Sequence, residues 1–192
     1  MTTYAQLQAD FPLWMKRTDL GTSLSGFVAL FESRVGRRLR VRGMETAFTG
    51  TINASNKIAL PANFLAFKTL WAGSNDCTLK AQSLESLVDR RQVTGTPTLY
   101  AIDGISARFN GTGSVAGVYF AAVPGLVASG TNWLSVLAYD AYLFGALAEG
   151  ELYSLNPQAA ATYTARAESI LADIAATDVR DRFSGPLVSR VR

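Results

Sequence analysis

Hydrophobic residues recur at helical spacing in the first part of the chain. Leu7 and Phe11 share one helical face, and Pro12 is expected to end this short helix because proline disfavours a helical conformation in the residue before it. A longer helix is predicted from Ser23, a candidate N-cap, to a stop near Gly43. Its apolar positions follow at intervals of three and four: Leu24, Phe27, Val28, Phe31, Val35 and Leu39.

Two more helices are predicted in the second half. Residues 132–154 carry apolar side chains around nearly the whole helical circumference, which indicates a central helix or one at an interface. Asn156 and Pro157 form a strong start signal for the next helix, with an N-cap followed by proline at the first helical position. After Thr177 the periodicity ends, and Gly185-Pro186 opposes helix formation. We therefore predict an extended arm over residues 178–192.

The middle of the chain, residues 48–123, has a different pattern. Short apolar runs alternate with Gly, Asn, Asp and Pro clusters, which is typical of antiparallel sheet. Asp103-Gly104 is a two-residue hairpin signal, and residues 83–91 have the spacing of a short helix. The pattern predicts an α+β protein: residues 1–45 and 131–177 form a helical bundle, residues 46–130 a β-rich insertion, and residues 178–192 the arm.

Composition excludes several kinds of chemistry. The 192 residues include no histidine and one cysteine, so histidine-based catalysis, histidine metal sites, intramolecular disulfides and thiolate zinc clusters are excluded. Acidic residues two apart, such as Glu149 and Glu151, do not face each other on a helix, which speaks against a catalytic carboxylate pair. Asp140, on an otherwise apolar helix, is expected to pair with an arginine or lie at the surface. We expect no enzyme activity, no cofactor and no metal; an enzyme with a carboxylate base ranks last.

The chain lacks a membrane-spanning run and a signal-peptide pattern near its start, so we expect a protein that stays where it is made, without a membrane partner. Its net charge is +3, which is small for a dedicated DNA-binding protein. A basic cluster nevertheless marks the end of the first long helix: Arg34, Arg37, Arg38, Arg40 and Arg42. These arginines fit a solvated helix end, a protein interface or a nucleic-acid contact.

The predicted arm combines arginines with apolar residues. A frayed terminus is one interpretation, but apolar side chains are uncommon in disordered tails. Their alternation with arginine fits a segment that becomes ordered on a partner. The residues concerned are Arg180, Arg182, Phe183, Leu187, Val188, Arg190, Val191 and Arg192.

A succession of motifs resembles the head-to-tail adaptor proteins of tailed bacteriophages, the group related to podovirus tail tubular protein A. The motifs are LFESRVGRRLRVRGME (30–45), IALPANFL (58–65), TGTPTLYAI (94–102), NWL (132–134) leading into YDAYLFGALAE (139–149), and RDRFSG (180–185). The resemblance covers nearly the whole chain, in order, although the strand after Ser114 lacks the proline-led segment that we would expect of the group.

The resemblance implies a non-enzymatic virion protein at the head–tail neck, assembled in the host cytoplasm. Such adaptors form a ring, usually a dodecamer, between the portal and the tail. The portal protein would bind the arm, and the β-rich domain would face the next tail component, such as a nozzle, tail terminator or tail tube. The ring lumen would pass the genome during ejection without sequence-specific binding. The alternative is a nucleic-acid-binding accessory protein that uses residues 34–42.

Overall fold

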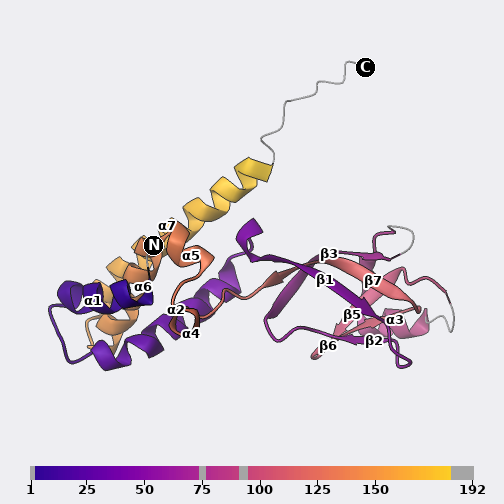
Figure 1. Cartoon of the computed structure of the whole chain (residues 1–192), viewed down its shortest axis with the longest axis horizontal. Helices are drawn as coiled ribbons and strands as arrows, with labels where there is room; N and C mark the ends of the chain where they lie inside the picture. The colour runs from indigo at the N-terminus through magenta and orange to yellow at the C-terminus, as the bar shows by residue number, and fades with distance from the viewer. Residues whose placement is uncertain (1–2, 74–76, 91–94, 183–192) are drawn as a thin grey trace, which may run out of the picture. The chain divides into compact units, whose positions relative to one another are not determined.

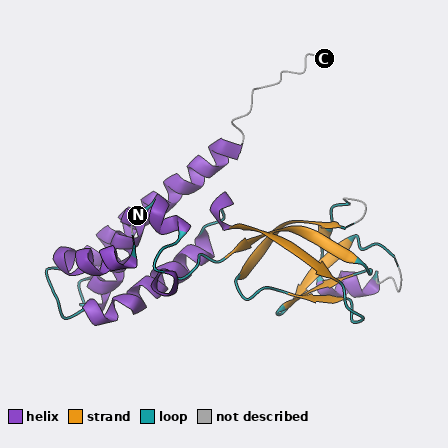
Figure 2. Ribbon diagram, in the orientation of Figure 1, coloured by secondary structure: helices purple, strands orange, loops and turns teal. Residues whose placement is uncertain are grey.

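The chain folds into two compact units, one helical and one built mainly of strands (Figures 1 and 2). The computed structural model describes residues 3–73, 77–90 and 95–182. The helical unit contains residues 1–43 and 123–192, and the β unit contains residues 44–122. The predicted α+β class is confirmed.

The unit boundaries differ from those expected from the sequence. The chain divides after residues 43 and 122 instead of after 45 and 130. The later shift has a local cause: residues after 122 include a short helix, α4 (Leu126–Ser129), and the Leu126 backbone N–H donates to Glu32 Oε1 at 2.7 Å. This bond joins α4 to the helical unit.

Two small sheets and a short helix form the β unit. One sheet has the order β1-β7-β3 and is antiparallel; the other has the order β2-β6-β5-β4, in which β4 runs parallel to β5. Phe48, Leu70, Phe109 and other buried side chains form its core. The elements are β1 (Glu45–Thr51), β2 (Lys57–Ala59), β3 (Phe64–Ala72), β4 (Lys80–Ala81), α3 (Leu84–Asp89), β5 (Leu99–Asp103), β6 (Ser106–Phe109) and β7 (Ser114–Ala121).

The local signals within the β unit lie close to the observed turns. In the predicted hairpin, Asp103 pairs with Ser106, so the two-residue loop is Gly104-Ile105, one residue later than expected. Gly104 has φ 60°, a conformation that glycine adopts without strain. Helix α3 is shorter than predicted, and the Ser83 hydroxyl caps it by accepting from the Ser86 N–H.

The helical unit is built around α6, as its apolar circumference predicts. Helices α1, α2, α5 and α7 all contact α6. Gly145 of α6 lies against the ring of Phe31 of α2, where an ideal Cβ would come within 2.2 Å of the ring. Glycine therefore allows these two helices to approach closely. The helices are α1 (Tyr4–Met15), α2 (Leu24–Arg38), α4, α5 (Trp133–Leu137), α6 (Tyr139–Tyr153) and α7 (Pro157–Arg182).

Pro12 does not end the first helix, contrary to the prediction. Helix α1 continues to Met15, and the Lys16 N–H bonds to the Pro12 carbonyl. Phe11 is fully buried and Met15 nearly so, and both touch the position of Gly150 on α6. Burial of these side chains compensates for the backbone hydrogen bond that proline removes.

Helix α2 ends at Arg38, five residues before the predicted stop. Leu39 begins a short non-helical stretch, in which Leu39 and Val41 are buried and Arg40 is exposed, and the exposed Arg42 begins a 3-10 turn, Arg42–Met44. This two-residue alternation is the burial pattern of extended chain. The prediction that Arg40 and Arg42 belong to the same helix as Arg34 was therefore wrong.

The helix predicted over residues 132–154 is broken at Ala138. Its backbone angles there are φ −145° and ψ 73°, and α6 begins at Tyr139. On one side of the break Trp133 packs on Gly43, and on the other the Tyr139 hydroxyl donates to Asp10 Oδ2 at 2.6 Å. Helices α5 and α6 thus contact different parts of the chain. These contacts between residues distant in sequence override the local preference for one continuous helix.

Leu155, between α6 and α7, provides a stability prediction. It has φ 59° and an 89% exposed side chain, and its N–H bonds to the Leu152 carbonyl. Glycine is the preferred residue in this left-handed conformation after a helix. Leu155→Gly should raise the free energy of unfolding by about 1 kcal/mol, measured by urea denaturation. The matched change Leu152→Gly, within α6, should lower it by about 1 kcal/mol; a loss of stability in both would contradict the prediction.

Candidate interface at the end of the C-terminal helix

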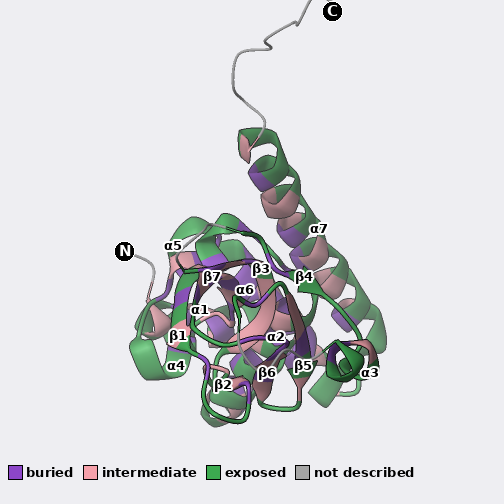
Figure 3. Ribbon diagram, turned by 90° about the vertical axis from the view of Figure 1, so that its right-hand side faces the viewer, coloured by how far each residue is buried: buried purple, intermediate pink, exposed green. Residues whose placement is uncertain are grey.

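Helix α7 begins at the predicted Asn156-Pro157 signal and continues to Arg182. Buried segments recur between exposed ones along its length (Figure 3). Residues 178–182 are helical, so the prediction of an extended arm was wrong for them. The reason is a set of charged contacts that keeps the last turns helical after the apolar stripe has ended.

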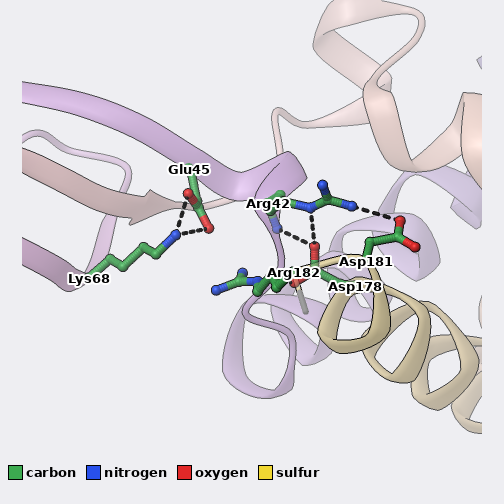
Figure 4. A network of polar contacts seen from close by, with 6 residues as sticks. All are labelled: Arg42, Glu45, Lys68, Asp178, Asp181 and Arg182. Atoms are coloured by element: carbon green, nitrogen blue, oxygen red, sulfur yellow. Dashed lines mark hydrogen bonds and ion pairs between the residues drawn. The ribbon is translucent and has the colours of Figure 1, made fainter. Parts of the chain in front are cut away.

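Asp178 is the centre of these contacts (Figure 4). Its Oδ1 accepts from the backbone N–H of Arg42 at 3.1 Å and from Arg42 Nε at 2.9 Å, and its Oδ2 accepts from Arg182 Nε at 2.7 Å. Arg42 Nη2 also reaches Asp181 Oδ2 at 2.7 Å. The chain after α2 is thereby tied to the end of α7.

The electrostatics of this cluster favour the ionised carboxylate. Burial of the Asp178 side chain, which is 9% exposed, acts to raise its pKa. The hydrogen bonds from Arg42 and Arg182 outweigh burial and hold the pKa of Asp178 below its usual value. The hydrogen bond to Asp178 in turn raises the pKa of Arg42. The cluster therefore stays charged at neutral pH and stabilises the last turns of α7.

The predicted arm residues fall into two groups. Arg180 and Arg182 lie on the last turn of α7, where Arg180 is exposed and Arg182 contacts Asp178. Six predicted arm residues lie outside the described part of the chain: Phe183, Leu187, Val188, Arg190, Val191 and Arg192.

The five arginines of the basic cluster are engaged within the helical unit. Arg34 forms a short ion pair with the buried Glu149 of α6. Arg38 pairs with Glu168 of α7 at 2.7 Å, and Arg42 binds the Asp178 cluster. Arg37 donates to Ser33 Oγ at 2.8 Å, and Arg40 donates to the carbonyls of Gly36 and Leu39. Arg34, Arg38 and Arg42 thus connect α2 and the segment directly after it to α6 and α7.

A groove lies beside the end of α7. It encloses about 700 Å³ between α7, the α5–α6 break and the segment after α2. Trp133, Ile170 and Ile174 are half-buried within it, and Leu137 is 63% exposed. Four aspartates and one arginine also line the groove, and all of them except Asp178 are exposed: Asp140, Asp173, Asp178, Asp181 and Arg42.

The acids considered in the sequence analysis do not form a catalytic pair. Glu149 binds Arg34, whereas Glu151 accepts from the Asn156 side chain at 3.0 Å. Asp140 is exposed in the groove, and its Oδ1 accepts from the Ala141 N–H at 3.1 Å. Neither a cluster of potential metal ligands nor a membrane-spanning helix is present within residues 3–73, 77–90 and 95–182.

Sequence analysis missed a polar centre at Glu32. Its Oε1 accepts from the Leu126 N–H and from the hydroxyl of the fully buried Tyr142, at 2.7 and 2.9 Å. Burial raises the pKa of Glu32, although these two hydrogen bonds partly counteract the shift. Glu32 lies four residues after Val28 and three before Val35, so its position on the apolar face was a signal available in the sequence.

Two comparisons with known proteins bear on the identity of the chain. A protein-family model described as SU10 adaptor protein matches residues 2–190. No curated protein matches the chain.

Proposed function

Since the chain belongs to the SU10 adaptor protein family, and is thus a structural adaptor protein of a bacteriophage, we propose that it forms a ring between the portal and the tail. The portal protein binds residues 180–192, and the β unit meets the next tail component, such as a nozzle, tail terminator or tail tube. Twelve copies surround the channel through which the genome leaves. The protein is non-enzymatic, lies in the virion neck and is assembled in the host cytoplasm. Its relation to podovirus tail tubular protein A stays a prediction.

The end of α7 is the observation that supports this proposal most strongly. Asp178 is buried and pairs with Arg42 and Arg182, so the last turn of α7 is tied to the segment after α2. The ten residues that follow contain four apolar side chains, two arginines and no acid. A segment of this composition gains free energy when a partner covers its apolar side chains. In this proposal Arg182 positions the segment, and the exposed Arg180 together with residues 183–192 contacts the portal.

Light scattering of the full chain mixed with the cognate portal protein tests the proposal. We expect a ring-sized complex, heavier than the portal alone by about twelve chains, because the head-to-tail adaptors that the chain resembles usually form dodecamers. A portal peak of unchanged mass at equimolar concentration would contradict it.

The alternative, nucleic-acid binding through residues 34–42, is less well supported. Arg34, Arg38 and Arg42 form ion pairs with acids of the same unit, so phosphate binding would have to displace these partners. If the chain binds DNA, the Arg37→Glu/Arg38→Glu variant should lose affinity and show a smaller salt dependence; unchanged affinity would exclude this mode.

A further inference from the structure

The groove beside α7 combines two features that a single occupant must match. Its floor is apolar, with Trp133, Leu137 and Ile174 incompletely buried. Its rim is acidic, and within the described chain neither Asp140 nor Asp173 pairs with a cation. A matching occupant therefore carries apolar side chains and positive charge together, since each property alone leaves the other half of the groove unmatched.

The chain itself carries such a segment directly after the groove. Residues 187–192 have the sequence LVSRVR, with apolar residues at 187, 188 and 191 and arginines at 190 and 192. They follow Ser184-Gly185-Pro186, a combination of residues that favours a chain reversal.

The dimensions of segment and groove agree. The part of α7 that lines the groove runs from Ile170 to Asp181, which is roughly 16 Å of helix at the usual rise per residue. Six extended residues span about 20 Å. The tether begins at Arg182, beside the acidic rim, so the segment's effective concentration at its own groove is in the ~mM range that short linkers give.

We propose that residues 187–192 bind in the α5–α7 groove of their own chain before assembly, with Leu187, Val188 and Val191 on the apolar floor and Arg190 and Arg192 facing Asp140 and Asp173. The groove then keeps the apolar side chains of the segment away from water. If the proposed function holds, portal and groove compete for the same segment, and assembly exchanges one contact for the other.

Paramagnetic relaxation in the full chain tests this proposal without any portal. Cys77 is the single cysteine, so Cys77→Ser together with Ser189→Cys places one nitroxide label in the segment. The indole N–H signal of Trp133 should lose most of its intensity when the label is active. The groove variant Leu137→Ser/Asp140→Asn/Asp173→Asn should restore the signal. All three side chains are exposed, and asparagine can still accept the bond that Asp140 Oδ1 receives.

A matched control and a mixing experiment identify the occupant. Glu85→Gln/Asp89→Asn removes the same charge from exposed positions in the β unit and should leave the Trp133 signal broadened. An unaffected Trp133 signal in the labelled wild-type background would overturn the proposal. In a mixture of ¹⁵N chains without a spin label and spin-labelled ¹⁴N chains, the Trp133 signal should stay sharp. Equal broadening in this mixture would also overturn the proposal, because the segment would then come from a neighbouring copy.

Discussion

Phe31→Ala is expected to lower the free energy of unfolding of the helical unit by about 3–5 kcal/mol. The Phe31 side chain is fully buried, and its ring packs edge-to-face on Tyr142 with centroids 5.2 Å apart. Gly145, which lies against the ring, has no side chain that could move into the space. The substitution therefore creates a cavity at the contact between α2 and α6, in addition to removing buried apolar surface.

Chemical denaturation followed by far-ultraviolet circular dichroism measures this loss. Leu30→Ala is the matched control, because Leu30 precedes Phe31 on α2 and its side chain is 55% exposed. The control should change stability by less than about 0.5 kcal/mol. Similar losses in the two variants would show that Phe31 is not at the packing centre of the helical unit.

Glu32→Ala is expected to destabilise the helical unit by about 1–3 kcal/mol. The alanine leaves the Leu126 N–H without its acceptor and removes the carboxylate from the Tyr142 hydroxyl. Tyr142 keeps its bond from the Asn132 side chain, at 2.7 Å, which limits the loss. Glu32→Gln, which retains a carbonyl oxygen, should keep most of the stability at neutral pH. Equal destabilisation by alanine and glutamine would contradict the assigned hydrogen bonds.

The pH dependence of the same residue gives a second test. Burial raises the pKa of Glu32 in the folded protein, so the folded state takes up a proton more readily than the unfolded chain. This carboxyl therefore adds stability as the pH falls through its folded-state pKa, and the effect is complete below its unfolded pKa of about 4.3. Glutamine lacks this proton uptake. Wild type should gain stability relative to Glu32→Gln between about pH 7 and pH 4; a constant difference would contradict the assignment.

Local sequence signals predicted where elements begin better than where they end. Helix α7 begins at Pro157, directly after Asn156, and α3 begins after Ser83, whose hydroxyl caps it. Both signals act within a few residues of the helix start, so the sequence shows them directly. The end of α2 depends instead on burial of Leu39 and Val41, and the break at Ala138 on the separate partners of Trp133 and Tyr139. Those partners are distant in sequence, so helical periodicity could not reveal them.

The residue types of the candidate site could be predicted from the sequence, but their contacts with one another could not. The sequence showed the cluster of arginines between residues 34 and 42. It also showed that residues 183–192 combine apolar side chains with arginines. The partners of Arg34 and Arg42, however, are Glu149 and Asp178, each more than a hundred residues away. The groove also depends on the break at Ala138, which the sequence did not predict. Ion pairs between residues distant in sequence therefore determine which charged side chains can still bind another protein.

Portal binding by a chain shortened at Arg182 tests the central claim most directly. The cut keeps the Asp178 contacts and all described helices, so the circular dichroism spectrum of the shortened chain should remain helical. The full-length variant Leu187→Ser/Val188→Ser/Val191→Ser is the matched control for chain length. Light scattering of mixtures with the portal protein should give a ring-sized complex with the full chain and the portal mass alone with both variants. A complex of full mass with the shortened chain would contradict the assignment of residues 183–192 as the portal anchor.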